Sequence, residues 1–314
     1  MKDKLLKLLC CPKCKEDLAI HKSEIVSDKI RNGDLQCPVC QIKYPIKNFI
    51  PRFVKTDKYV KSFSFEWQIH HKTQLDSTRS VSESEDTFIE KTGLKLEKLK
   101  GKLILDVGCG VGRYIEPVAR CAQEVVGIDL SYAVDSAQEN LKYFDNVHII
   151  QADIFNLPFK KETFDFIYSI GVLHHTPDTK KAFLNLIPFL KKGGSIAIWL
   201  YSNETRYERV SNKFTDFYRF FTRRLPKRLL WYLCHLAIPL YTLKNIKKLR
   251  TVLDLVLPMS NHPDPEWRVL DTFDWYSPMF QHKHTYREVV AWFEEAGLRD
   301  IELLNFPVSV KGRK

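Results

Sequence analysis

The sequence has no apolar run long enough to cross a membrane. No window of about 18 residues, the length that a membrane-spanning helix needs, is apolar throughout and free of charge. Met1–Leu9 alternates charged residues with leucine, whereas a secretory signal has a continuous apolar core. We therefore expect no membrane-spanning segment and a reducing, cytoplasmic setting.

Acidic residues are outnumbered, with 38 Asp and Glu against 49 Lys and Arg, which gives a formal net charge of +11. Most of this excess lies in residues 204–250, where twelve basic residues accompany three acidic ones. Aromatic residues alternate with arginines in part of that segment, and Leu229–Leu243 is uncharged apart from a neutral histidine. Such a segment favours an anionic partner, either a lipid surface or a nucleic acid.

Glycine is scarce, and three of the 12 glycines stand at alternate positions within residues 108–112. The mostly apolar Leu103–Val107 before them predicts a buried parallel strand. Glycines at the end of such a strand let the backbone approach a ligand and adopt unusual φ/ψ values. A dinucleotide fingerprint would place its third glycine at position 113, which is Arg. The pattern favours a cofactor site, and a strand turning into a helix without a ligand is the alternative.

Two further strands are predicted at Val125–Asp129 and His148–Asp153, and each ends in an acid. An acid at the tip of the second strand can accept both ribose hydroxyls of an adenosyl group that lies across the first turn. The segments LDVGCGVG, VVGIDLS, QADIFNLPF and FDFIYSIGVLHH, within roughly residues 100–201, resemble in their order the motifs of class I S-adenosylmethionine-dependent methyltransferases.

This resemblance implies a Rossmann-like α/β fold, with a seven-stranded sheet whose last strand is antiparallel, and S-adenosylmethionine as cofactor. The glycines are expected beside its methionine part and Asp129 at its ribose. Asp153 with Ile154 is expected at the adenine, and Asp106 beneath the methionine ammonium. The complete predicted cofactor set is Asp106, Gly108, Cys109, Gly110, Gly112, Asp129, Leu130, Asp153, Ile154, Ile170, Trp67 and Gln74.

Alternating strands and helices continue after the cofactor motifs, as in a parallel sheet covered on both faces. A helix is predicted from about Asp178 to a stop at Gly193–Gly194. Thr285–Glu288 is a capping box that opens a helix ended by Gly297. The last two strands are expected to pair through the single residue Pro307.

Five of the eight cysteines lie in the first 40 residues. Cys11 and Cys14, and then Cys37 and Cys40, form two C-P-x-C motifs separated by 22 residues, a spacing typical of a four-thiolate zinc site. Cys10 stands next to a predicted ligand, but the paired spacing favours Cys11. Disulfides or redox thiols are the alternatives, and a cytoplasmic chain disfavours the former.

The N-terminal 1–55 segment, with Leu5–Leu9 before the first cysteine pair and Tyr44–Ile46 and Phe49–Phe53 after the second, resembles a Trm112-type zinc ribbon. That family usually supports or partners methyltransferases, so the resemblance implies a structural Zn²⁺. So small a segment has little core of its own, and metal binding is expected to supply folding energy.

Residues 56–100 are predicted to be an arm that leads to the first strand. Aromatic residues alternate with polar ones in it, which favours an anchor on the catalytic domain. The alternative is that Trp67, Gln74 or Glu85 closes over the methionine end of the cofactor.

Histidines and aromatics after the fourth and fifth predicted strands are the candidates for chemistry and for acceptor binding. A histidine has a pKa near neutrality and can take a proton from an acceptor, although related motifs often use it only to shape the cofactor pocket. Metal binding by the last two histidines has no accompanying carboxylate spacing. The predicted catalytic residues are His174, His175 and Tyr201, and the predicted substrate-pocket residues are Tyr276, His282 and His284.

An insertion of roughly 70 residues, 203–270, is predicted to be a helical lid, flanked by catalytic segments 101–202 and 271–314. It either caps the core, docks on acidic lipid through 214–250, or contacts RNA. The most favoured function is methyl transfer to an O or N atom of a small or lipid-linked metabolite. An RNA methyltransferase is one alternative, and a non-catalytic scaffold that uses the ribbon is another. The acceptor and the oligomeric state are left open.

Overall fold

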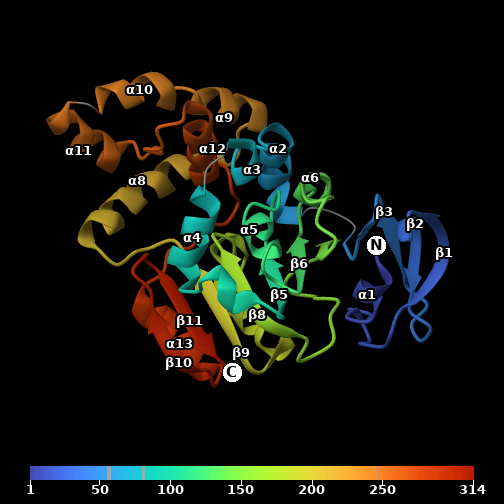
Figure 1. Ribbon diagram of the computed structural model, residues 1–314. Coiled ribbons are helices and arrows are strands. Elements are labelled where there is room, and N and C mark those ends of the chain that lie inside the picture. The colour runs from blue at the N-terminus through green and yellow to red at the C-terminus, as the bar shows by residue number, and fades with distance from the viewer. Residues whose placement is uncertain (55–57, 80–81, 245) are drawn as a thin grey trace.

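The computed structural model describes residues 1–54, 58–79, 82–244 and 246–314. Its centre is a seven-stranded sheet with the order β7-β6-β5-β8-β9-β11-β10 (Figure 1). Neighbours from β7 to β9 pair in parallel, and β11 is antiparallel to both β9 and β10, as predicted. The strands are β5 (Leu103–Val107), β6 (Glu124–Asp129), β7 (Val147–Gln151), β8 (Phe164–Ile170), β9 (Leu190–Trp199), β10 (Arg299–Leu303) and β11 (Ser309–Arg313).

Helices cover both faces of this sheet because its central strands are apolar on both sides. One face packs against α7 (Thr179–Leu184) and α13 (Tyr286–Glu295). The other packs against α4 (Glu83–Thr92), α5 (Ile115–Ala119) and α6 (Ala133–Asn140). The sheet is therefore a rigid support whose strand ends can position a site.

The predicted capping box is confirmed at the start of α13. Thr285 Oγ1 accepts a hydrogen bond from the Glu288 amide, Glu288 Oε2 accepts one from the Thr285 amide, and Gly297 follows the helix with a φ of +71°. The single-residue connection of the last two strands is wrong, because β10 pairs Leu303 with Val310 and the intervening residues form a longer loop.

The predicted helix stop at Gly193–Gly194 is also wrong. Helix α7 ends at Leu184, and β9 runs through both glycines. Gly193 has a φ of +76° and donates a hydrogen bond to the carbonyl of Lys314, whose amide donates to Gly194. The glycines thus join the chain end to β9, which an apolar pattern does not reveal.

The N-terminal unit is a small antiparallel sheet that packs on the edge of the large one, at β7 (Figure 1). The backbone of Arg52 forms a parallel β-bridge with Gln151 of β7, and the Arg52 guanidinium donates to the Gln151 side chain at 2.8 Å. The unit therefore protects an otherwise open strand edge. Its elements are α1 (Asp3–Leu6), β1 (Ala19–Val26), β2 (Lys29–Gln36), β3 (Lys43–Lys47) and β4 (Ile50–Pro51).

The arm folds into short helices above the cofactor strands. After the turn Lys58–Val60 it forms α2 (Lys61–Ile69) and α3 (Asp76–Arg79), which lead to α4. Phe65 packs on Phe273 with ring centroids 5.8 Å apart, so the arm is anchored as expected.

The insertion is helical, as predicted, and Figure 1 shows it at the upper left, away from the N-terminal unit. The Leu229–Leu243 run divides between two helices and is not a single 15-residue one. The predicted limit at residue 270 falls inside the last helix, which continues into the catalytic segment. The helices are α8 (Arg206–Thr222), α9 (Lys227–Cys234), α10 (Ala237–Leu243), α11 (Lys247–Val256) and α12 (Pro265–Tyr276). Within the described ranges, no helix is long and apolar enough to span a membrane.

Candidate active site

A cavity of about 650 Å³ opens at the carboxyl ends of β5, β6, β8 and β9. In open α/β sheets this edge is where ligands bind. The arm and helix α12 close the cavity from the other side, since Trp67, Gln74, Asp271 and Asp274 line it together with the glycine turn after β5. The site is thus assembled from the ends of the sheet strands, the arm and α12, which are far apart in the sequence.

The glycine turn brings bare backbone to the cavity. Gly110 has a φ of +53°, and a Cβ there would lie 3.6 Å from the indole of Trp67. Gly108, Cys109 and Gly110 line the cavity, whereas Gly112 completes the turn beneath them, with a φ of +92°. A side chain at Gly110 would occupy the space that the arm leaves above the turn.

Asp129, at the tip of β6, holds this turn in place. Its Oδ2 accepts a hydrogen bond from the Gly110 amide at 3.0 Å, and its Oδ1 accepts from the Ser131 amide at 2.7 Å and hydroxyl at 2.6 Å. Burial raises the pKa of Asp129, and these donors oppose that rise. A carboxylate fixed in this way also faces the cavity, where it can accept from ribose hydroxyls.

The other predicted cofactor residues divide between the cavity wall and its support. Leu130, Ile154 and Ile170 line the cavity, as do Trp67 and Gln74 of the arm. The remaining two acids lie behind the wall.

Burial raises the pKa of Asp106 to about 8, and the neighbouring Tyr168 hydroxyl opposes that rise. Asp153 accepts a hydrogen bond from the Phe155 amide, which fixes the turn after β7. Neither of these acids lines the cavity.

The three predicted catalytic side chains lie together after β8 and β9. The ring centroids of His174 and Tyr201 are 4.0 Å apart, and His175 and Tyr201 line the cavity while His174 lies behind them. Burial lowers the pKa of His175 to about 3, so its imidazole is neutral near pH 7. A histidine this weakly basic is a poor general base but a good hydrogen-bond acceptor.

The predicted substrate residues are not in the cavity lining. Tyr276 is buried, and its hydroxyl donates to the carbonyl of Pro258. The backbone amides of His282 and His284 donate to the carbonyls of His174 and Tyr201. Their neighbours on α12 and in the loop after it line the cavity instead. These are Asp271, Asp274, Trp275, Gln281 and Lys283.

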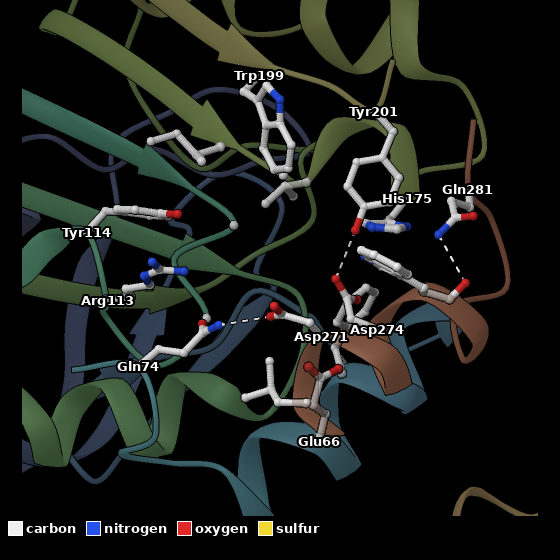
Figure 2. A pocket seen from close by; sticks show the side chains of 18 of the residues that line it. Glu66, Gln74, Arg113, Tyr114, His175, Trp199, Tyr201, Asp271, Asp274 and Gln281 are labelled. Carbon is white, nitrogen blue, oxygen red and sulfur yellow. Dashed lines mark hydrogen bonds between the residues drawn. The ribbon is translucent and has the colours of Figure 1, made fainter. Parts of the chain in front are cut away.

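Sequence reasoning also missed Glu66, which lies on α2 and is 1% exposed in the cavity wall. Figure 2 shows Glu66, Asp271 and Asp274 converging beneath Tyr201 and His175. Tyr201 donates to Asp274 at 3.2 Å, and Gln74 donates to Asp271 at 3.5 Å. An acid at position 66 between aromatic residues was the one available signal.

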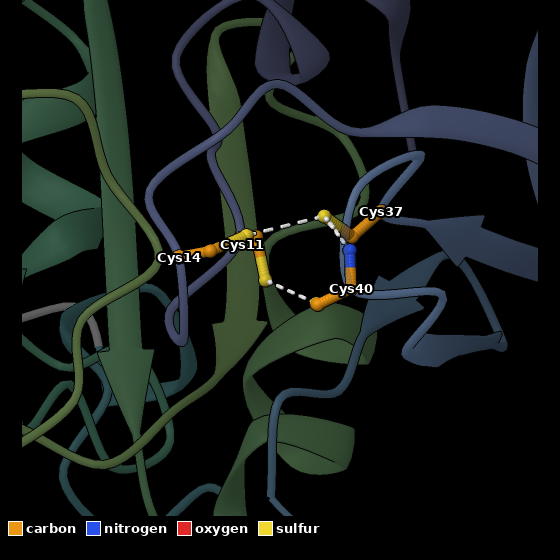
Figure 3. Close-up of side chains that lie close together, drawn as sticks. All are labelled: Cys11, Cys14, Cys37 and Cys40. Atoms are coloured by element: carbon orange, nitrogen blue, oxygen red, sulfur yellow. Dashed lines mark hydrogen bonds between the residues drawn. The ribbon is translucent and has the colours of Figure 1, made fainter.

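The four predicted metal ligands come together in the N-terminal unit (Figure 3). The Sγ atoms of Cys11, Cys14, Cys37 and Cys40 all lie within 4.8 Å of one another. Tetrahedral zinc with Zn–S bonds near 2.3 Å needs S···S separations of about 3.8 Å, so the four thiols fit that ion. Cys10 points away and donates to the Phe159 carbonyl at 3.0 Å, which agrees with its predicted exclusion.

Two family models match the chain. Residues 105–198 match the model described as a methyltransferase domain, and residues 2–48 match that of a Trm112p-like protein. The cofactor turn and Asp129 lie in the first match, and the four cysteines lie in the second.

Curated relatives are similar over part of their length. A tRNA U34 carboxymethyltransferase of Pseudoalteromonas translucida is 35% identical over 107 residues, 33% of this chain and 33% of that protein. Sterol 24-C-methyltransferase of Saccharomyces cerevisiae is 28% identical over 134 residues, 41% of this chain and 34% of that protein. The chain therefore spans about a third of the length of each of these two relatives.

Among solved structures, a SAM-dependent methyltransferase from Aquifex aeolicus is 17% identical, with a TM-score of 0.41, over 73% of this chain and 92% of that one. The sheet order, the glycine turn with Asp129 and the two family matches agree with one another. Residues 105–198 thus belong to the class I S-adenosylmethionine-dependent methyltransferase domains, and residues 2–48 belong to the Trm112-like family.

Proposed function

We propose that the whole protein transfers a methyl group from S-adenosylmethionine to an O or N atom of a small or lipid-linked molecule. The observation that carries this proposal is the glycine turn that Asp129 fixes at the floor of a cavity large enough for both a cofactor and an acceptor. The bound cofactor would supply an electrophilic methyl group on its sulfonium sulfur.

The chain's own residues would then bind and orient. Asp129 would accept from the ribose hydroxyls, and Trp67 and Gln74 would cover the methionine part beside Gly110. His175 and Tyr201 would hold the acceptor in line with the methyl group, since both line the far part of the cavity. Positioning of this kind can supply most of the rate, because the donor is already reactive.

We further propose that the four cysteines hold one structural Zn²⁺. Cys11 and Cys37 are buried, and the adjoining Leu9 and Cys10 bind the Pro158–Phe159 segment between β7 and β8. The metal would therefore stabilise the support of the cofactor strands and would not take part in the chemistry.

The insertion supports a contact with an anionic membrane surface, which would admit a lipid-linked acceptor. Its α9 buries Leu230 and Cys234 against α12, which also lines the cavity. Other side chains of α8, α9 and α10 are apolar and exposed, and basic residues lie between them in the sequence. The exposed apolar residues are Phe217, Phe220, Phe221, Leu229, Tyr232, Leu233, Leu236, Ile238, Leu243 and Ile246.

Liposome binding tests this contact. Exchanging Arg223, Arg224 and Arg228 for Gln should release the protein from anionic vesicles, since each basic residue near such a surface contributes about 1 kcal/mol. Lys227 is left in place because it donates to the Ser277 carbonyl. The control exchanges three exposed basic residues of the arm, Lys95, Lys98 and Lys100. Equal recovery in the supernatant with and without anionic vesicles at low salt would contradict the contact.

An RNA acceptor is the second candidate, favoured by the basic insertion and by the similarity to a tRNA U34 carboxymethyltransferase. Binding that neutralises several phosphates weakens steeply as salt rises. RNA affinity that is low and insensitive to salt would exclude this candidate.

The decisive experiment for methyl transfer has two steps. Titration with S-adenosylmethionine should show binding, which a pure scaffold does not require. Incubation of the purified protein with methyl-labelled cofactor and fractionated cell extract should then label one fraction. Failure to bind the cofactor would refute the proposed function.

A further inference from the structure

One end of the cavity presents buried acceptor atoms that have no donor. Glu66 Oε2, Asp274 Oδ1, His175 Nε2 and Gln281 Oε1 are all buried and lack a hydrogen-bond partner among the described residues. All four side chains line the cavity. They come from α2, α12, the turn after β8 and the loop after α12, so four separate elements meet there (Figure 2).

The surrounding hydrogen bonds leave these atoms as acceptors. His175 Nδ1 lies 2.9 Å from the Phe280 carbonyl, which can only accept, so Nδ1 carries the proton and Nε2 keeps a lone pair. Gln281 uses its amide donor on a backbone carbonyl at 3.2 Å. Tyr201 donates its hydroxyl proton to Asp274 Oδ2. A ligand that satisfies this wall must therefore supply several hydrogen-bond donors.

The wall also holds three acidic side chains, Glu66, Asp271 and Asp274. Burial, together with the neighbouring carboxylates Asp274 and Asp271, raises the pKa of Glu66, and burial with Asp271 raises that of Asp274 to about 7. Asp271 accepts from the Ser260 hydroxyl at 2.9 Å and adds its charge from the side. Buried carboxyl groups that interact in this way share protons until a cation enters.

Basic side chains near the cavity are engaged elsewhere. Arg219 and Lys283 both pair with Asp216 on the outer side of α8. Lys91 lies 3.4 Å above the ring of Trp199. On the cofactor side, the Arg113 guanidinium donates to the Ser84 hydroxyl at 3.3 Å. In the described ranges, no ion pair joins these cations to Glu66 or Asp274.

We propose that this acidic end of the cavity, formed by Glu66, Asp274, His175 and Gln281, binds the cationic amine of the methyl acceptor. This inference rests on the proposed methyl transfer and narrows it to N-methylation. The ammonium gives one proton to a carboxylate of the wall, and the freed lone pair forms the new N–C bond. The S–C bond breaks with its electron pair left on sulfur, so the positive charge passes to the methylated nitrogen.

A matched pair of probes tests the charge that the wall recognises. The protein, saturated with S-adenosylhomocysteine, is titrated with benzylamine and with benzyl alcohol at pH 7.5, and tryptophan fluorescence is followed because Trp199 and Trp275 line the cavity. We expect benzylamine to bind at least tenfold more tightly. Calorimetry in buffers of different ionisation enthalpy should show proton release on binding, because the bound ammonium favours the ionised form of the carboxyl groups in the wall. Equal affinity, or no binding of the amine, would overturn the proposal.

Two isosteric variants locate the effect. Glu66→Gln and Asp274→Asn should each weaken benzylamine at least tenfold and leave benzyl alcohol unchanged. The exposed Glu294→Gln on α13 is the matched control and should change neither. Unchanged amine affinity in both folded wall variants would refute the assignment. The comparison of the two probes on the unaltered protein remains decisive even where a variant does not fold.

The cofactor also carries an ammonium, on its methionine part, and a second titration separates the two sources. Affinity for S-adenosylhomocysteine should stay within twofold in both wall variants, because Figure 2 places Glu66 and Asp274 on the Tyr201 side, away from Arg113 and Tyr114. A parallel loss of that affinity would assign the wall to the cofactor and overturn the proposal. Cofactor binding with preferred methylation of an alcohol would leave the proposed function standing and reject only this narrower inference.

Discussion

Replacing Asp129 by Ala should weaken cofactor binding and destabilise the protein at the same time. The carboxylate accepts three hydrogen bonds from Gly110 and Ser131, and we propose that it also accepts from the ribose. Loss of two charge-assisted bonds to the ribose costs roughly 2 to 4 kcal/mol. At about 1.4 kcal/mol per factor of ten, this is a loss of about 30- to 700-fold in affinity for S-adenosylmethionine. The unpaired amides should lower the free energy of unfolding by about 1 to 3 kcal/mol as well.

Calorimetric titration and denaturant unfolding measure the two effects separately. Ser131→Ala is the matched control, because it removes one donor of the turn and leaves the carboxylate in the cavity. It should lower stability while affinity changes by less than about threefold, a difference below 1 kcal/mol. A folded Asp129→Ala protein with unchanged affinity would refute the assignment of Asp129 to the ribose.

Three further predictions concern the metal, the pH dependence and the docking of the N-terminal unit. Cys37→Ser should release zinc and loosen residues 2–48 while cofactor still binds, and full zinc occupancy by metal analysis would contradict this. Because burial raises the pKa of Asp274 from 3.8 to about 7, folding takes up a proton there, and the stability this gives is lost as the pH rises from about 4 to 7. The difference in free energy of unfolding between Asp274→Asn and the wild-type protein should therefore increase with pH by up to about 1.4 kcal/mol per unit. Parallel curves of the two free energies against pH would argue against the raised pKa. Arg52→Met should cost about 2 kcal/mol, because it leaves the buried Gln151 Oε1 without its donor, and should speed hydrogen exchange in the N-terminal unit, whereas unchanged exchange would show that the contact is weak.

The sheet and the cysteine cluster could be predicted because their signals are local. An apolar strand that ends in glycines or an acid defines its own position in the chain, and so do two paired cysteines. The strand that carries Asp106 was predicted with both ends right, and the strand that ends in Asp129 was predicted with its last residue right. The cluster of Cys11 with its three partners came together as the spacing indicated.

Features that depend on distant residues could not be read in this way. Gly193 and Gly194 look like a helix stop, yet they lie in a strand because they pair with the last residue of the chain. His282 and His284 look like pocket residues, yet their loop presents Gln281 and Lys283 to the cavity. The orientation of a loop depends on the packing around it, which a single sequence does not encode locally.

The insertion shows most clearly why the sequence predicted only part of the site. As a separate lid it would end before the catalytic segment resumes, but its last helix, α12, continues through the predicted limit and carries Asp271 and Asp274 into the cavity. The same helix packs through Phe273 against Phe65 of α2, one residue before Glu66. The apolar contact between these two helices therefore also brings their acids together. A change in the packing of the insertion should thus alter acceptor binding more than cofactor binding, because hydrogen bonds to Asp129 and to the Ile128 carbonyl fix the glycine turn to β6.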